Sequence, residues 1–228
     1  MKNVILTVFL LIFSPPIIFA QTYAEYKVLA EHGDADAQYN LAMCYAKGNG
    51  VAKNPYYATE MLKKAAEQGH IKAQSELGVS YQKGIGVAQN YTEAVKWYRK
   101  AAVQGNANAQ YNLGNCYTNG WGVTKSYSDA VKWYRKAAEQ GLVQAQYNLG
   151  TYYCQGIGIA VNYTEGAKWL KKAAEQGCAE AQYNLAICYA NGNGVPQSDN
   201  EAIKWLKKAA RQNFSEAKQA LIYIGESW

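Results

Sequence analysis

The sequence predicts an all-α fold, a solenoid of consecutive helix–turn–helix repeats. A 36-residue pattern recurs five times without a gap, and each copy holds two helical periodicities separated by a glycine-containing turn. Two short helices cannot bury both of their faces alone, so the repeats must stack into one continuous core. The predicted repeats span residues 34–69, 70–105, 106–141, 142–177 and 178–213.

Residues 1–20 are typical of a secretory signal peptide. Lys2 supplies the positive charge, residues 4–13 are apolar, Ser14-Pro15-Pro16 should break any helix, and Ala20 precedes the expected cleavage site. The apolar run is shorter than the ~20 residues that span a bilayer, so we expect no membrane anchor after cleavage. A retained N-terminal anchor is the alternative. Residues 21–33 then match the end of a repeat and predict a degenerate half-repeat that covers the first hydrophobic face.

All five repeats share one pattern of helices and turns, which residues 106–141 illustrate. Ala109, Leu113 and Tyr117 lie four positions apart and predict one apolar stripe on a first helix, helix A. A Gly-x-Gly turn should end it, because glycine adopts left-handed geometry readily. Helix B is expected to begin at Ser126, a capping residue followed three positions later by Asp129. After the last repeat, residues 214–228 keep the helix A spacing and predict a C-terminal capping helix.

A family resemblance follows from these anchor residues. The pattern A-x(3)-L-[GA]-x-x-Y-x-x-G-x-G-V, then A-x-x-W-x-x-K-A-A-x-x-G, resembles the Sel-one-like repeat, which is related to the tetratricopeptide repeat. Departures are few: Met61 replaces a Trp, Gly166 an Ala and Asn213 the closing Gly. The resemblance implies a right-handed α-solenoid superhelix that acts as a non-enzymatic interaction scaffold or adaptor.

Two short motifs suggest an alternative function. Ser80 and Lys83 fit the S-x-x-K motif of β-lactamases, and residues 198–200 fit S-D-N. Some cysteine-rich relatives in the family have been described as penicillin binders, so a weak β-lactam-hydrolysing or cell-wall-directed enzyme is the alternative. The motifs lie three repeats apart, however, and a nucleophile must be within hydrogen-bond reach of its base. We therefore predict no catalytic residue.

Metal, cofactor and nucleic-acid sites are not expected. Two histidines and no Cys/His/acid cluster with ligand spacing argue against a metal, and the Gly-x-Gly runs lack the context of a dinucleotide site. The net charge of +6 follows the repeated K-W-x-[KR]-K pattern, which favours a solvated helix face over a nucleic-acid surface. Weak attraction to acidic partners is the alternative.

The cysteines predict no disulfide framework. Three of them share one position next to the core, where a small buried thiol is expected. The disulfide-rich relatives carry a cysteine pair between helix B and the next helix A, where this chain has Ala and Gln. An odd number leaves free thiols or one chance pairing. The five are Cys44, Cys116, Cys154, Cys178 and Cys188.

Exposed positions that differ between repeats are free to recognise a partner. By resemblance to tetratricopeptide arrays, one face of helix A lines a concave groove. Its tyrosines offer apolar area with a polar tip, and its asparagines could bond a peptide backbone; alternatively, the tyrosines only pack between repeats. A loop tryptophan has Asn or Ile as counterparts and is a further candidate. The predicted partner-binding residues are Tyr39, Asn40, Tyr111, Asn112, Asn115, Trp121, Tyr147, Asn148, Thr151, Tyr183 and Asn184.

The sequence as a whole thus predicts an exported scaffold that binds a protein or peptide on the helix A face and needs no cofactor. We expect a monomer in the periplasm of a bacterium or secreted from it. The alternative is an adaptor in a eukaryotic secretory compartment, where Asn90 and Asn162 would be glycosylation sites.

Overall fold

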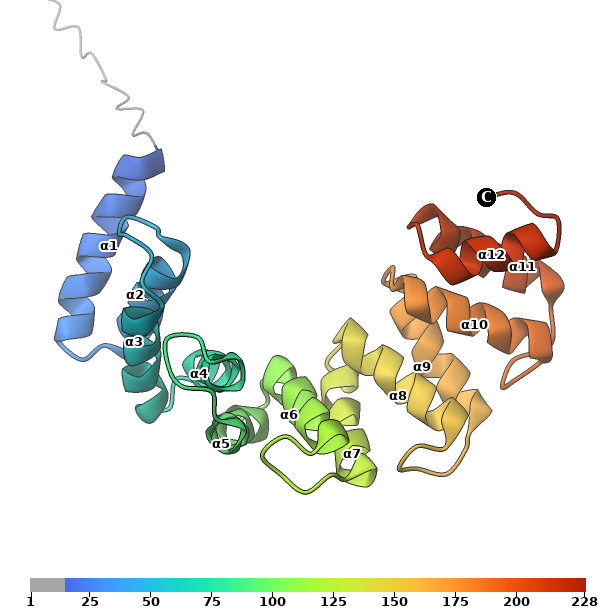
Figure 1. The fold of residues 1–228 in the computed structure, drawn as a ribbon, viewed down its shortest axis with the longest axis horizontal. Helices are drawn as coiled ribbons and strands as arrows, with labels where there is room; N and C mark the ends of the chain where they lie inside the picture. The colour runs from blue at the N-terminus through green and yellow to red at the C-terminus, as the bar shows by residue number, and fades with distance from the viewer. Residues whose placement is uncertain (1–14) are drawn as a thin grey trace, which may run out of the picture. The chain divides into compact units, whose positions relative to one another are not determined.

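The computed structural model describes residues 15–228, and within that range the chain consists of helices and loops (Figure 1). This confirms the predicted all-α solenoid. Residues 1–14 of the predicted signal peptide lie outside the described residues. The chain divides into two compact units between Gln89 and Asn90. None of the helices from residue 15 onward is long and apolar enough to cross a membrane.

The first unit contains α1, the first repeat (α2 and α3), and helix A of the second repeat (α4). Their bounds are α1 Pro15–Glu31, α2 Ala35–Lys47, α3 Pro55–Glu67 and α4 Ile71–Lys83. The second unit holds helix B of the second repeat, three complete repeats and a final helix. Their bounds are α5 Tyr91–Val103, α6 Ala107–Asn119, α7 Tyr127–Glu139, α8 Val143–Gln155, α9 Tyr163–Glu175, α10 Ala179–Asn191, α11 Asp199–Arg211 and α12 Ser215–Tyr223.

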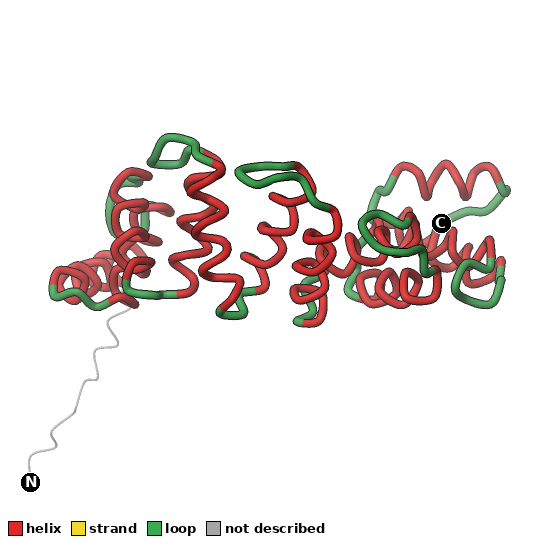
Figure 2. The backbone as a smooth tube through the Cα atoms, turned by 90° about the horizontal axis from the view of Figure 1, so that it is seen from below, coloured by secondary structure: helices red, strands yellow, loops and turns green. Residues whose placement is uncertain are grey.

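Within each unit, every helix packs against the next one along the chain, and short loops join them (Figure 2). The even-numbered helices from α2 to α10 are helices A and the odd-numbered ones from α3 to α11 are helices B, each 13 residues long. Leu113, Leu149 and Leu185, one on each successive helix A of the second unit, are fully buried. The predicted apolar stripe therefore forms the core.

The helix ends follow the predicted capping chemistry. The side chains at the five helix B N-caps each accept a backbone N–H three residues on: Asn54, Asn90, Ser126, Asn162 and Ser198. Each helix A ends at a glycine in the left-handed region, such as Gly120 with φ 74°. Asn213, which replaces the closing glycine, also has a positive φ of 66°, a geometry that asparagine tolerates.

The second glycine of each turn has a role that the sequence did not reveal. Gly122 has φ +68°, and a Cβ there would lie 2.3 Å from the backbone oxygen of Tyr91, the first residue of the preceding helix B. Gly158 and Gly194 approach Tyr127 and Tyr163 in the same way. These glycines let each turn rest directly on the previous repeat.

The small residue after each helix A leucine makes room for helix B of its own repeat. A Cβ on Gly114 would lie 2.6 Å from the ring of Tyr134, which is 1 % exposed. In the fifth repeat the position of Tyr134 holds a smaller side chain, Leu206, and the position of Gly114 holds an alanine, Ala186. The fourth repeat, which combines glycine with leucine, is the exception to this pairing. The two positions otherwise vary together.

A buried glutamine joins successive repeats. Gln146 donates to the carbonyl of Ala138 at the end of α7 (3.1 Å) and accepts from Gln176 at the end of α9 (2.7 Å). The same two bonds recur at Gln110 and at Gln182. The helix A glutamine thus links the end of the preceding helix B to the end of the helix B of its own repeat.

Replacing Gln146 with alanine is expected to lower the free energy of unfolding by about 2 kcal/mol, because one buried and one partly buried hydrogen bond are lost. Gln144→Ala is the matched control, since Gln144 is exposed on the same helix; its effect should stay within about 0.5 kcal/mol. Urea denaturation measures both. Equal losses in the two variants would contradict this role.

The N-terminal helix is longer than predicted. α1 begins at Pro15, and proline is tolerated in the first turn of a helix. Whether the Ser14-Pro15-Pro16 segment breaks a preceding helix stays a prediction, because residues 1–14 lie outside the described residues. α1 continues past residue 20, and the cleavage site there stays a prediction. Its later part packs on α2, where the Tyr23 and Tyr45 hydroxyls lie 3.1 Å apart. This packing is what a terminal half-repeat should provide.

The last helix keeps the predicted register. Ala217 and Leu221 on α12 are fully buried against the fifth repeat. Lys218, in the place of the glutamine, donates to the side-chain oxygen of Asn213 at 2.8 Å. The helix ends at Tyr223, before the predicted boundary at residue 228.

Candidate functional site: the helix A face

Tyr39, Tyr147 and Tyr183 of helix A contact the following repeat, Tyr111 contacts helix B of its own repeat, and all four stay half-buried. Tyr183 lies 5.4 Å from the ring of Phe214, and Tyr39 stacks on His70 at 4.6 Å. Tyr111 lies 5.7 Å from Tyr134, and Tyr147 packs against the core of the fifth repeat. These residues therefore stabilise the stack, as the alternative interpretation held, while each ring keeps a partly exposed edge.

Asn115 belongs to a polar network under this face. The Tyr134 hydroxyl donates to the Asn115 side-chain oxygen at 2.7 Å, and Asn148 also bonds that hydroxyl. Thr118 Oγ1 lies 3.1 Å from the hydroxyls of both Tyr134 and Tyr152. Burial raises the pKa of Tyr134 well above its usual value, so this hydroxyl stays protonated. Asn115 and Asn148 are thus committed to the fold more than the sequence suggested.

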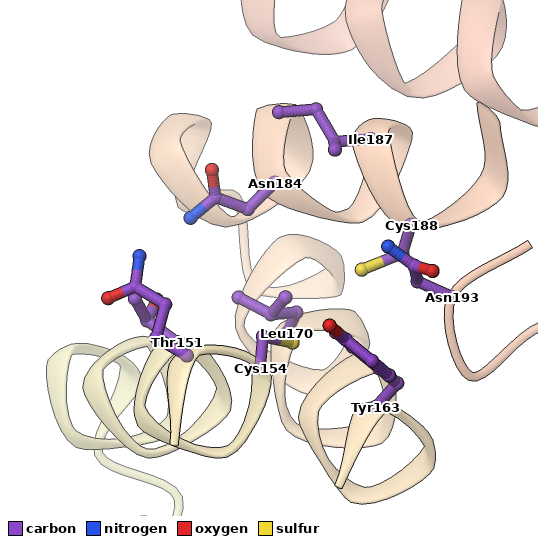
Figure 3. Close-up of a pocket in the computed structure, with 9 residues that line it drawn as sticks. Thr151, Cys154, Tyr163, Leu170, Asn184, Ile187, Cys188 and Asn193 are labelled. Atoms are coloured by element: carbon purple, nitrogen blue, oxygen red, sulfur yellow. The ribbon is translucent and has the colours of Figure 1, made fainter. Parts of the chain in front are cut away.

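A cavity of about 180 Å³ opens between α8, α9 and α10 (Figure 3). Two predicted binding residues line it, Thr151 and Asn184, and Ile187 beside them is 40 % exposed. Leu170 of α9 occupies the place that Tyr134 fills one repeat earlier. The shorter side chain accounts for space at this point of the face.

The first unit has its own groove, of about 490 Å³, next to Tyr39 and Asn40. His70 lies in it, with Nδ1 accepting from the backbone N–H of Ala73 (3.0 Å) and Nε2 at 3.1 Å from the Asp36 carboxylate. Nε2 must therefore carry the proton and donate it. Sequence reasoning assigned no role to His70, although its position before helix A, where Asp34 and Asn106 stand in other repeats, was an available signal.

The remaining predicted binding residues are spread over the second unit. Asn112 on α6 is half-buried beside Tyr111. Trp121 is 36 % exposed in the loop after α6 and stacks on Tyr91 at 5.6 Å. Trp121 thus contacts the preceding repeat with one ring face and solvent with the rest.

The repeated lysines are occupied within the chain. In each K-W-x-[KR]-K pattern, the first lysine pairs with the acid at the start of helix B, as Lys132 does with Asp129 at 2.9 Å. The last lysine lies over the tryptophan, as Lys208 does over Trp205 at 3.8 Å. This arrangement supports the solvated-face interpretation of the positive charge.

The motifs that suggested an enzyme have structural roles. Ser80 is 7 % exposed within α4, and Ser198 caps α11 by accepting the backbone N–H of Glu201. Among the described residues, no group of three His, Cys, Asp or Glu side chains could hold a metal ion. Cys44, Cys116 and Cys188 are buried, as their position predicted, and all five cysteines are free thiols.

Comparison with known proteins identifies the repeat. A profile described as the Sel1 repeat matches residues 35–70, 71–106, 107–142, 143–178 and 179–214. The structure of a protective antigen from uropathogenic Escherichia coli, displaying an SLR fold, is 35 % identical, with a TM-score of 0.88. The match covers 90 % of this chain and 44 % of the antigen. No curated protein matches the sequence.

Two further structures share the fold. A Sel1 repeat protein from Oxalobacter formigenes is 34 % identical, with a TM-score of 0.78, over 89 % of this chain and 58 % of that one. A Klebsiella pneumoniae protein described as a sel1 repeat protein is 21 % identical, with a TM-score of 0.53, over 90 % and 99 % of the two chains. The chain therefore spans about half the length of the E. coli and Oxalobacter relatives.

Proposed function

The chain belongs to the Sel1 repeat family, and we propose that it is a non-enzymatic scaffold that binds a protein or peptide through its helix A face. Sel1 repeat proteins generally act as scaffolds for protein interactions and typically lack enzymatic activity. Binding at this particular face, and a location outside the cytoplasm, are the two further parts of the proposal.

The observation that carries the proposal is a Tyr–Asn step that recurs on three successive helices A of the second unit, always half-exposed. The residues are Tyr111-Asn112, Tyr147-Asn148 and Tyr183-Asn184. Packed helices lie ~8–10 Å apart, and an extended chain advances ~3.3 Å per residue. A peptide crossing these helices would therefore meet one Tyr–Asn step about every three residues. The variable positions Thr151 and Ile187 lie one turn further along and would set its specificity.

The test compares partners captured by three forms of the mature protein. The face variant carries Asn112→Glu and Asn184→Glu, which add charge to the face and leave the tyrosine side chains themselves unchanged. The control carries Ser128→Glu and Thr164→Glu, the same charge change at exposed positions in the first turns of α7 and α9, where an acid is tolerated. Partners are quantified by mass spectrometry.

We expect at least one partner to be retained by the wild type and the control and reduced about tenfold or more on the face variant, which corresponds to about 1.4 kcal/mol of binding free energy. Retention of every captured partner by a face variant with unchanged thermal unfolding would refute binding at this face.

We also propose export, supported by the charge, apolar run and small residue of segment 1–20. The protein isolated from the periplasm or medium should begin at Gln21, as N-terminal peptide mapping would show. An intact Met1–Ala20 segment on the cellular protein would contradict cleavage.

A further inference from the structure

Two cysteines on neighbouring helices A face one another in the second unit. Cys154 lies near the end of α8 and Cys188 lies on α10, and these two helices are in contact. The equivalent residues one repeat earlier are Thr118 and Tyr152, also separated by 34 positions, and their side-chain oxygens are 3.1 Å apart. In this repeat geometry the side chains at the two positions point toward one another across the contact between the two helices.

Both thiols open onto the same space. Cys154 and Cys188 line the cavity of about 180 Å³ between α8, α9 and α10, together with Leu170 and Tyr163 (Figure 3). Cys188 is 5 % exposed and Cys154 is half-buried. A small molecule can therefore reach Cys154 more readily than Cys188, which is almost fully buried.

The neighbouring helix B makes room for the Cys154 sulfur. A Cβ at residue 166 would lie 2.3 Å from Cys154 Sγ, and Gly166 leaves that space free. The other four repeats have alanine there, namely Ala58, Ala94, Ala130 and Ala202. The one repeat with a cysteine at the end of helix A is thus the one whose helix B lacks the methyl group.

From this placement we infer that Cys154 and Cys188 are a reversible disulfide site that links the fourth and fifth repeats when the protein meets a disulfide oxidant. This goes beyond the proposed scaffold function and does not depend on it.

The environment assigns the two thiols different roles. A hydrogen bond from the Cys188 thiol lowers the pKa of Cys154, and the same bond, with burial, raises the pKa of Cys188. Because the thiolate is the nucleophile in disulfide exchange, Cys154 attacks first and Cys188 resolves.

The chemistry balances with a small disulfide such as oxidised glutathione. The Cys154 thiolate attacks one of its sulfurs, the S–S bond breaks, and one glutathione leaves as a thiolate. Cys188 then loses its proton to solvent and attacks Cys154 Sγ in the mixed disulfide, which releases the second glutathione. The protein dithiol is oxidised to a disulfide, and one oxidised glutathione is reduced to two thiols.

The experiment uses the Cys178→Ser protein, so that each of the two relevant tryptic peptides, residues 137–168 and 173–204, holds a single cysteine. The reduced protein is incubated with excess oxidised glutathione, alkylated and digested. We expect the two peptides to be joined, two of four thiols to disappear, and dithiothreitol to restore both. Oxidation should raise the Tm by about 5 °C or more.

Two matched variants complete the test. Adding Cys116→Ser, which removes a buried thiol on α6, should leave the cross-link unchanged, whereas adding Cys188→Ser should abolish both the cross-link and the Tm shift. The inference is overturned if the peptides stay separate in the folded protein, or if Cys154 joins another cysteine instead.

Discussion

Replacing Gly122 with alanine is expected to lower the free energy of unfolding by about 3 kcal/mol or more. The residue has φ +68°, which disfavours any side chain. The new Cβ would also meet backbone atoms of Tyr91 at 2.3 and 2.4 Å. Since backbone cannot rotate away as a side chain can, the turn must lift off the preceding repeat.

Gly141→Ala is the control for this prediction. Gly141 has φ +90°, and no atom lies within 4 Å of the place that a Cβ would take, so alanine there costs only backbone strain, about 1–2 kcal/mol. Urea denaturation of the two variants gives the comparison. If both substitutions cost the same, the close approach of turn and helix does not contribute to stability.

The second large effect is expected at Gly114. Alanine there would place its Cβ 2.6 Å from the buried Tyr134 ring, so Gly114→Ala should destabilise the protein by about 2–3 kcal/mol through overpacking. In a Tyr134→Leu background the same change recreates the alanine–leucine combination of the fifth repeat, Ala186 with Leu206, and should be neutral or stabilising by up to about 1 kcal/mol.

A double-mutant cycle measures this dependence. We expect a coupling free energy of about 2 kcal/mol or more between positions 114 and 134. Additive effects of Gly114→Ala and Tyr134→Leu would show that the ring and the glycine do not share the space, contrary to the packing described above.

The parts of the fold that local chemistry determines could be predicted from the sequence. Capping at Ser126, the left-handed turn at Gly120 and the buried leucines all depend on residues within one turn of each other. The contact of Gly122 with Tyr91 and the bonds of Gln146 could not, because they join repeats across distances that only the stacked geometry sets.

The side of helix A that forms the candidate binding face could be predicted from the sequence, but the hydrogen bonds of its side chains could not. Helix periodicity places Tyr147 and Asn115 on one side of helix A, but it cannot say that Asn115 bonds a buried tyrosine. That information was present as a correlation between repeats, since Tyr134 stands where three of the other repeats have leucine. That Cys154 and Cys188 line one cavity could not be predicted for the same reason, although Gly166 is the only residue at its repeat position that is not alanine.

Site-specific photo-crosslinking can detect a partner bound to the helix A face without altering the fold. A photo-reactive residue replaces Ile187, which is 40 % exposed on α10, or Ser128, which is exposed on the first turn of α7. If the scaffold binds through this face, a partner captured by the wild type is cross-linked at position 187 and about tenfold less at position 128. Cross-linking at position 128 alone, or equally at both positions, would rule out helix A as the binding face.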